Sequence, residues 1–143
     1  MFTLSGELVN ALRRRARSLL KHAYIYLNDG DFDLACYNCQ QALELYLKSL
    51  IYELFGEEVK ICSLRELLGI LHKRLRDAGR SRDAELIETI IENYRGVILG
   101  LEDANVDARY GTKPYDRKDA MDSIEAVEQI IEKLEKVRKR VVA

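Results

Sequence analysis

"FDLACYNCQQALELYLKSLIYELFG" (32–56) contains no proline, and its only glycine is the last residue. Apolar side chains recur along it at spacings of three and four, which predicts a helix. They are Phe32, Ala35, Cys36, Cys39, Leu43, Tyr46, Leu47, Leu50 and Leu54. Further apolar residues at 34, 42, 45 and 51 widen the stripe. A helix that is apolar over so much of its circumference is central in a bundle or is shared with a second subunit.

Capping residues and periodicity set the bounds of this helix and predict four more. Asp31 precedes the stretch as an N-cap, and Gly56 ends it in the C′ position. "SLRE" (63–66) is a capping box, which starts another helix. The four additional helices are expected at about 6–27, 63–78, 81–106 and from 116 onward.

The expected architecture is all-α, because no segment alternates with period two between turn signals. Short linkers place sequential long helices antiparallel. The chain should therefore form an up-and-down four-helix bundle, with the short helix at 63–78 lying between the second and third long helices. Residues 1–143 are expected to form a single domain.

Composition limits the classes of function. The 143 residues are 48% hydrophobic and 33% charged, with a net charge of −1. No apolar run reaches the roughly 20 residues that span a bilayer, so we expect a cytoplasmic protein without a membrane partner. A balanced charge means that any basic patch is local. The basic stretches at 13–22 and 72–82 are interpreted as solvated helix faces, unless they adjoin a ligand site.

The cysteines suggest core residues rather than a metal site. "CYNC" (36–39) has C-x-x-C spacing, but neither a second ligand pair nor a βαβ pattern accompanies it. Cys36 and Cys39 also fall on apolar positions of the helix. We therefore expect no metal, no disulfide and no cofactor.

"ARYGTKPYD" (108–116) interrupts the helical pattern and contains the only proline of the chain. Gly111, Pro114 and Asp116 are explained by a helix–helix connection with a capped restart. The remaining residues of interest in the stretch are basic or aromatic: Arg109, Tyr110, Lys113 and Tyr115.

Guanidinium and aromatic groups are suited to holding a phosphate and a stacked base. We expect the connection to lift Arg109 and its neighbours out of helical register, so that these side chains gather at one end of the bundle. Asp103 and Asp107, one turn apart before the connection, are expected to orient Arg109.

The stretch at 32–56, followed by "DARYGTKPYDRKDAMDSIEAVEQIIEKL" (107–134), resembles the HEPN domain family. The resemblance covers nearly the whole chain and implies an all-helical bundle that forms homodimers. Many family members are metal-independent ribonucleases, in which an arginine is followed four to six residues later by a histidine. Many are encoded beside a minimal nucleotidyltransferase and form a toxin–antitoxin pair with it.

The family arginine matches Arg109, but the histidine has no match among Lys113, Pro114 and Tyr115. Metal-free RNA cleavage needs a proton carrier whose pKa lies near neutrality, whereas Lys and Tyr have ordinary pKa values near 10. We therefore expect a dimeric RNA- or nucleotide-binding module that is the partner of a minimal nucleotidyltransferase in a toxin–antitoxin-like system. The alternatives are a metal-independent ribonuclease that uses Arg109 with Lys113 or Tyr115, and a purely structural dimer.

Overall fold

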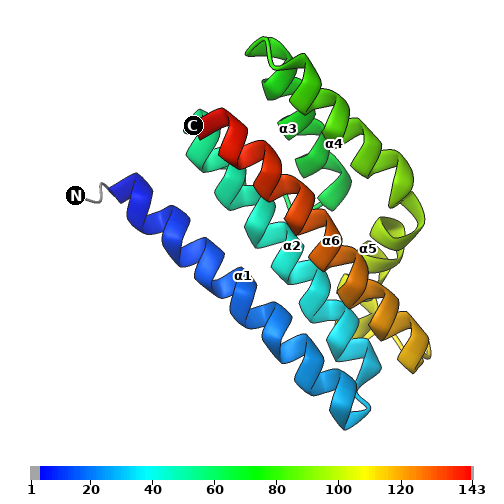
Figure 1. Cartoon of the computed structure of the whole chain (residues 1–143). Coiled ribbons are helices and arrows are strands. Elements are labelled where there is room, and N and C mark those ends of the chain that lie inside the picture. The colour runs from blue at the N-terminus through cyan, green and yellow to red at the C-terminus, as the bar shows by residue number, and fades with distance from the viewer. Residues whose placement is uncertain (1–3, 143) are drawn as a thin grey trace.

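The computed structural model describes residues 4–142 and contains six helices and no strand within them (Figure 1). This confirms the all-α class. The helices are α1 (Leu4–Asp29), α2 (Phe32–Phe55), α3 (Leu64–Asp77), α4 (Ser81–Asn93), α5 (Arg95–Tyr110) and α6 (Arg117–Val142). Within these residues no helix is long and apolar enough to cross a membrane.

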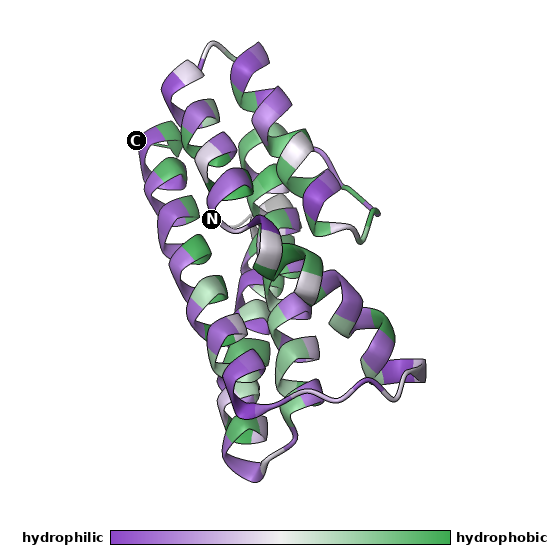
Figure 2. Ribbon diagram, turned by 90° about the vertical axis from the view of Figure 1, so that its right-hand side faces the viewer, coloured by the Kyte–Doolittle hydropathy of each residue, from purple (hydrophilic) through white to green (hydrophobic). Residues whose placement is uncertain are grey.

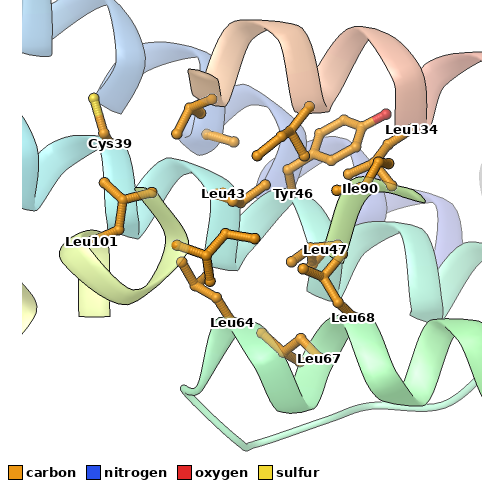
Figure 3. Packing of buried hydrophobic residues seen from close by; sticks show 14 of the residues in the cluster. Cys39, Leu43, Tyr46, Leu47, Leu64, Leu67, Leu68, Ile90, Leu101 and Leu134 are labelled. Atoms are coloured by element: carbon orange, nitrogen blue, oxygen red, sulfur yellow. The ribbon is translucent and has the colours of Figure 1, made fainter. Parts of the chain in front are cut away.

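Helix α2 is the centre of the bundle, and α1, α3, α5 and α6 all pack against it. Figure 3 shows Leu43 and Leu47 of α2 lying beside Leu64, Leu67 and Leu68 of α3, and all five side chains are fully buried. The wide apolar surface of α2 is therefore covered within one chain. It no longer argues for a second subunit.

Several helix ends follow the sequence signals. The Ser63 hydroxyl accepts a hydrogen bond from the backbone N–H of Glu66 at 3.3 Å, as the capping box predicts. Gly56 follows α2 with φ = 67°, the left-handed conformation that glycine adopts without steric cost. Asp31 directly precedes α2, but its side chain makes no capping hydrogen bond.

The helix predicted at 81–106 is broken at Tyr94, where φ and ψ are −112° and 15°. The segment before the break packs mainly on α3, whereas the segment after it packs mainly on α2. The Tyr94 hydroxyl donates to Oε1 of Gln129 on α6 at 2.8 Å. The apolar residues before and after Tyr94 continue one helical periodicity, so nothing in the sequence indicated the break.

The four long elements of the bundle are α1, α2, α6 and the broken pair α4–α5 (Figure 1). Helix α3 lies in the connection between α2 and α4. Hydrophilic and hydrophobic segments alternate along the helices in Figure 2, as expected of amphipathic helices around one core. Helix α1 packs along α2 and makes few contacts with α6.

Candidate functional site

The candidate site lies at the C-terminal end of α5. This helix extends further along the chain than the sequence predicted. Arg109 and Tyr110 belong to the last turn of α5, so the expectation that the connection lifts them out of helical register is wrong. The backbone N–H of Gly111 closes that turn on the carbonyl of Asp107 at 2.9 Å. Pro114 restricts the residue before it to extended backbone, which keeps the helix from resuming at once.

Gly111 is required because its backbone lies close to Asp107, not because it adopts a left-handed conformation. Its φ is −96°, which any residue adopts. A Cβ atom placed on Gly111 would lie 2.6 Å from Oδ1 and 2.9 Å from Cα of Asp107. Past the connection, Asp116 and Asp119 cap α6 reciprocally, each carboxylate accepting the backbone N–H of the other at 2.8 and 3.0 Å.

Arg109 rests on Tyr37 of α2. Its Nη2 donates to the Tyr37 hydroxyl at 3.1 Å, and its guanidinium lies 5.6 Å from the centre of the Tyr37 ring. The hydrogen bond to Tyr37 raises the pKa of Arg109, so the group stays charged. Arg109 is exposed, and among the described residues no carboxylate forms an ion pair with it.

Asp107 does not orient Arg109 as expected. Its Oδ2 accepts the Tyr115 hydroxyl at 2.6 Å. Burial and this hydrogen bond raise the pKa of Tyr115 well above its ordinary value. Asp103 is exposed and forms no ion pair with Arg109 in the described part of the chain. The orienting group is Tyr37, which the sequence analysis did not single out.

Lys113 and Tyr115 form a separate group. The ammonium of Lys113 lies 5.4 Å from the centre of the Tyr115 ring. Both residues line a hollow of about 340 Å³ between α5 and the start of α6, together with Asp119 and Asp122. Within residues 4–142 no hydrogen bond or ion pair joins Arg109 to this group. The gathering of all four residues at one point therefore stays a prediction.

Tyr110 is the most exposed large apolar residue at this end of the molecule, with 83% of its surface accessible. It follows Arg109 directly on the outer surface of α5. Leu99 and Val106, also exposed, lie on the same side of the helix, because seven and four residues separate the three positions. This face of α5 thus presents three exposed apolar residues, Leu99, Val106 and Tyr110, with the exposed Asp103 between the first two. We call these three residues the α5 stripe.

Polar residues continue from Arg109 along the contact between α2 and α5. The amide of Gln41 donates to Oδ1 of Asn105 at 3.3 Å and to Oε1 of Gln40 at 2.6 Å. Tyr37 and Gln41 are four residues apart on α2, as are Asn105 and Arg109 on α5, so each pair shares a face. That spacing of polar residues on an otherwise apolar helix was the signal that could have located Tyr37.

Gln40 continues this chain of contacts, donating to Glu44 at 3.1 Å, and Lys48 donates to the same carboxylate at 3.1 Å. Glu44 and Lys48 thus form an ordinary i,i+4 ion pair on α2.

The basic stretch at 13–22 does not extend the Arg109 region. Helix α1, which carries residues 13–22, packs on α2 and makes no contact with α5. In the stretch at 72–82, Arg74 pairs with Glu57 at 2.8 Å and Arg80 with Asp83 at 3.7 Å. Part of that charge therefore stabilises helix contacts.

Cys36 and Cys39 are buried on α2, which confirms their assignment to the core. The Ser123 hydroxyl lies 3.6 Å from Sγ of Cys36. Burial raises the pKa of both thiols, so both stay protonated near neutral pH. Cys62 is exposed.

Comparison with known proteins bears on the fold and on Arg109 together. No curated protein and no solved structure matches the chain. A family model described as the HEPN domain matches residues 9–137, from the first turns of α1 almost to the end of α6. This range includes α2, the α5 terminus and the connection to α6. The chain belongs to the HEPN domain family.

Proposed function

We propose that this HEPN protein is a dimeric binding module that holds RNA or a nucleotide at Arg109. The observation that carries the proposal is the state of Arg109: an exposed guanidinium, supported by Tyr37 and free of carboxylate partners in the described chain. Arg109 is held in place by a neutral group, so its charge stays available to a ligand.

The contact with Tyr37 uses only part of the hydrogen-bonding capacity of Arg109. A guanidinium has five N–H donors in a planar fork, and the structure assigns one, on Nη2, to the Tyr37 hydroxyl. The remaining donors match the oxygens of a phosphate, and the aromatic support reduces the entropy lost on binding. The exposed ring of Tyr110 offers a surface on which a base can stack. Lys113 supplies a further positive charge, also exposed, on the connection that follows.

Metal-independent RNA cleavage at this site is the less favoured function. Tyr115 is the aromatic residue nearest the position of the missing family histidine. Its hydroxyl donates to Asp107, and its pKa is raised, so it is poorly suited to accept a proton near neutral pH. The geometry therefore supports binding without turnover.

The dimer is proposed to form through Leu99 and Val106 of the α5 stripe, which are 40% and 58% exposed, because a second copy would remove this apolar surface from water. Tyr110 is left to the ligand. A two-fold contact with the two α5 helices parallel would place both 111–116 connections at the same end. Sedimentation should show a dimer for the wild type and a monomer for Val106→Asp, with helicity unchanged. A monomeric wild type at micromolar concentration would remove the dimer from the proposal.

The proposed protein partner is a minimal nucleotidyltransferase, as in many HEPN toxin–antitoxin pairs, and this part rests on family membership alone. Co-expression with a nucleotidyltransferase encoded beside the gene should yield a complex that survives gel filtration. Separate elution of the two proteins would count against the partnership.

Binding and cleavage can be distinguished in one experiment. A short oligouridylate labelled with fluorescein is titrated with wild type and with Arg109→Ala, and the RNA is then examined for cleavage on a denaturing gel in the presence of chelator. The proposal predicts saturable binding that Arg109→Ala weakens, and intact RNA throughout. RNA cleaved by the wild type but not by Arg109→Ala would replace the binding module with a ribonuclease.

A further inference from the structure

A second pocket lies far from Arg109, between α1 and α6 and above the middle of α2. Its volume is about 390 Å³, near the lower end for small-molecule sites. Leu20, Tyr46 and Ile131 contribute apolar surface, and Arg17 and Glu135 lie on opposite walls, on α1 and α6. It exists because α1 and α6 both pack on α2 but make few contacts with each other.

Polar bridges between helices limit the pocket along its length. On one side, Glu53 of α2 accepts hydrogen bonds from Arg13 of α1 at 2.6 Å and from Arg138 of α6 at 2.7 Å. On the other side, the Tyr24 hydroxyl of α1 donates to Glu128 of α6. These bridges connect α1, α2 and α6 beyond the residues that line the pocket.

One of the arginines that line the pocket is unpaired. The lining arginines are at 13, 17 and 138. Arg13 and Arg138 share Glu53, and Arg138 also lies 3.6 Å from Glu135, which accepts the Tyr46 hydroxyl. Arg17 has no carboxylate partner among the described residues. Arg17 is therefore the lining arginine whose charge is not paired within the described residues.

Both Nη atoms of Arg13 are bonded to Glu53, so the charge of Arg13 is already paired. The pocket thus combines one unpaired cation, Arg17, with an apolar lining.

We propose that this pocket binds a small amphipathic monoanion, a carboxylate with an apolar body. The carboxylate would pair with Arg17, and the apolar body would cover Leu20 and Ile131. The single unpaired cation favours one negative charge over the two of a phosphate monoester. The site shares no residue with the proposed RNA site, so either can fail without the other.

The test uses octanoate as the probe, with octanol and octylamine as matched compounds of the same chain length. Isothermal titration should show one octanoate per chain, with octanol binding about tenfold more weakly and octylamine not at all. Arg17→Gln should weaken octanoate about tenfold, to the affinity of octanol. Arg15→Gln is the control, because Arg15 is exposed on the same helix but does not line the pocket. It should stay within twofold of the wild type.

Filling the pocket gives an independent check. Ile131→Trp should abolish octanoate binding while circular dichroism still shows a folded helical protein. The proposal is overturned if octanoate does not saturate, if octanol equals octanoate, or if Arg17→Gln and Arg15→Gln behave alike. It is also overturned if Ile131→Trp changes the sedimentation coefficient to that of a different oligomer, because the pocket is then an interface between copies.

Discussion

The substitution Glu53→Gln should destabilise the bundle measurably, because one carboxylate connects three helices. Glu53 of α2 accepts two hydrogen bonds from Arg13 of α1, at 2.6 and 3.1 Å, and two from Arg138 of α6, at 2.7 and 3.5 Å. The glutamine keeps one acceptor oxygen but loses the charge and the second acceptor. Two partly buried guanidinium groups then lose their main counter-charge.

The expected loss is about 2 kcal/mol of unfolding free energy. Hydrogen bonds to charged groups contribute about 1.5–3 kcal/mol, and the 22% exposure of the Glu53 side chain places the value below that of a fully buried pair. For a chain of this size the loss corresponds to a fall in Tm of roughly 6–8 °C. Urea unfolding followed by circular dichroism measures it directly.

The pH dependence supplies a second readout. Burial alone would raise the pKa of Glu53, but hydrogen bonds from Arg13 and Arg138 outweigh it and hold the pKa below its usual range. A depressed carboxylate pKa gives stability that is complete above the unfolded-state value near 4 and is lost as the pH falls through the folded-state value. The difference between wild type and Glu53→Gln should therefore be full at pH 7 and shrink below about pH 4.

Glu57→Gln is the matched control, because Glu57 also pairs with an arginine through two hydrogen bonds, at 2.8 and 3.0 Å to Arg74. Both partners are 35% exposed, so the loss should stay below about 1 kcal/mol. Equal effects of the two substitutions, or a Glu53→Gln deficit that does not change between pH 7 and pH 3, would refute the reasoning.

Two further predictions concern the connection and the thiols. Gly111→Ala should lower the unfolding free energy by about 1–2 kcal/mol, because its Cβ would lie 2.6 Å from Oδ1 of Asp107. Gly100→Ala, whose Cβ would have no atom within 4 Å, should raise the unfolding free energy by about 0.5–1 kcal/mol through helix propensity. The two unfolding curves should shift in opposite directions, and a shared direction would contradict the assigned role of Gly111. A thiol reagent should label Cys62 alone in native protein, because Cys36 and Cys39 are buried, and metal analysis without added zinc should give less than one ion per chain. Equal labelling rates for all three thiols, or stoichiometric zinc, would be the contrary result.

Much of the fold was predictable because the local signals and the packing agree. Helix α2 combines a wide apolar surface with Gly56 at its end, and the capping box at Ser63 starts α3 as expected. The break at Tyr94 was not predictable, because it depends on where α3 and α2 lie in space. Periodicity reports which face of a helix is buried, not whether its two halves are buried against the same neighbour.

The candidate site was located by sequence only in part. Arg109 was found from the basic and aromatic character of its segment and from the family resemblance. Its partner Tyr37 is 72 residues away in the chain, so the contact follows from tertiary packing. Asp107 seemed suited to Arg109 from helical spacing, but the turn closed by Gly111 brings Tyr115 to it instead. Spacing along one helix cannot determine which of two nearby donors forms a hydrogen bond to a carboxylate.

The most direct test of the central claim is the affinity of a short labelled oligouridylate for wild type, Arg109→Ala and Arg95→Ala at one fixed salt concentration. Arg95 is exposed at the start of the same helix, about 21 Å away along its axis, so it controls for general loss of positive charge. We expect Arg109→Ala to weaken binding by roughly 10- to 150-fold, the equivalent of about 1.5–3 kcal/mol, and Arg95→Ala to stay within about twofold of the wild type. Melting temperatures of both variants should match that of the wild type. Equal affinities for the two variants, or no binding by the wild type together with a lowered melting temperature for Arg109→Ala, would contradict this expectation and make Arg109 a structural residue.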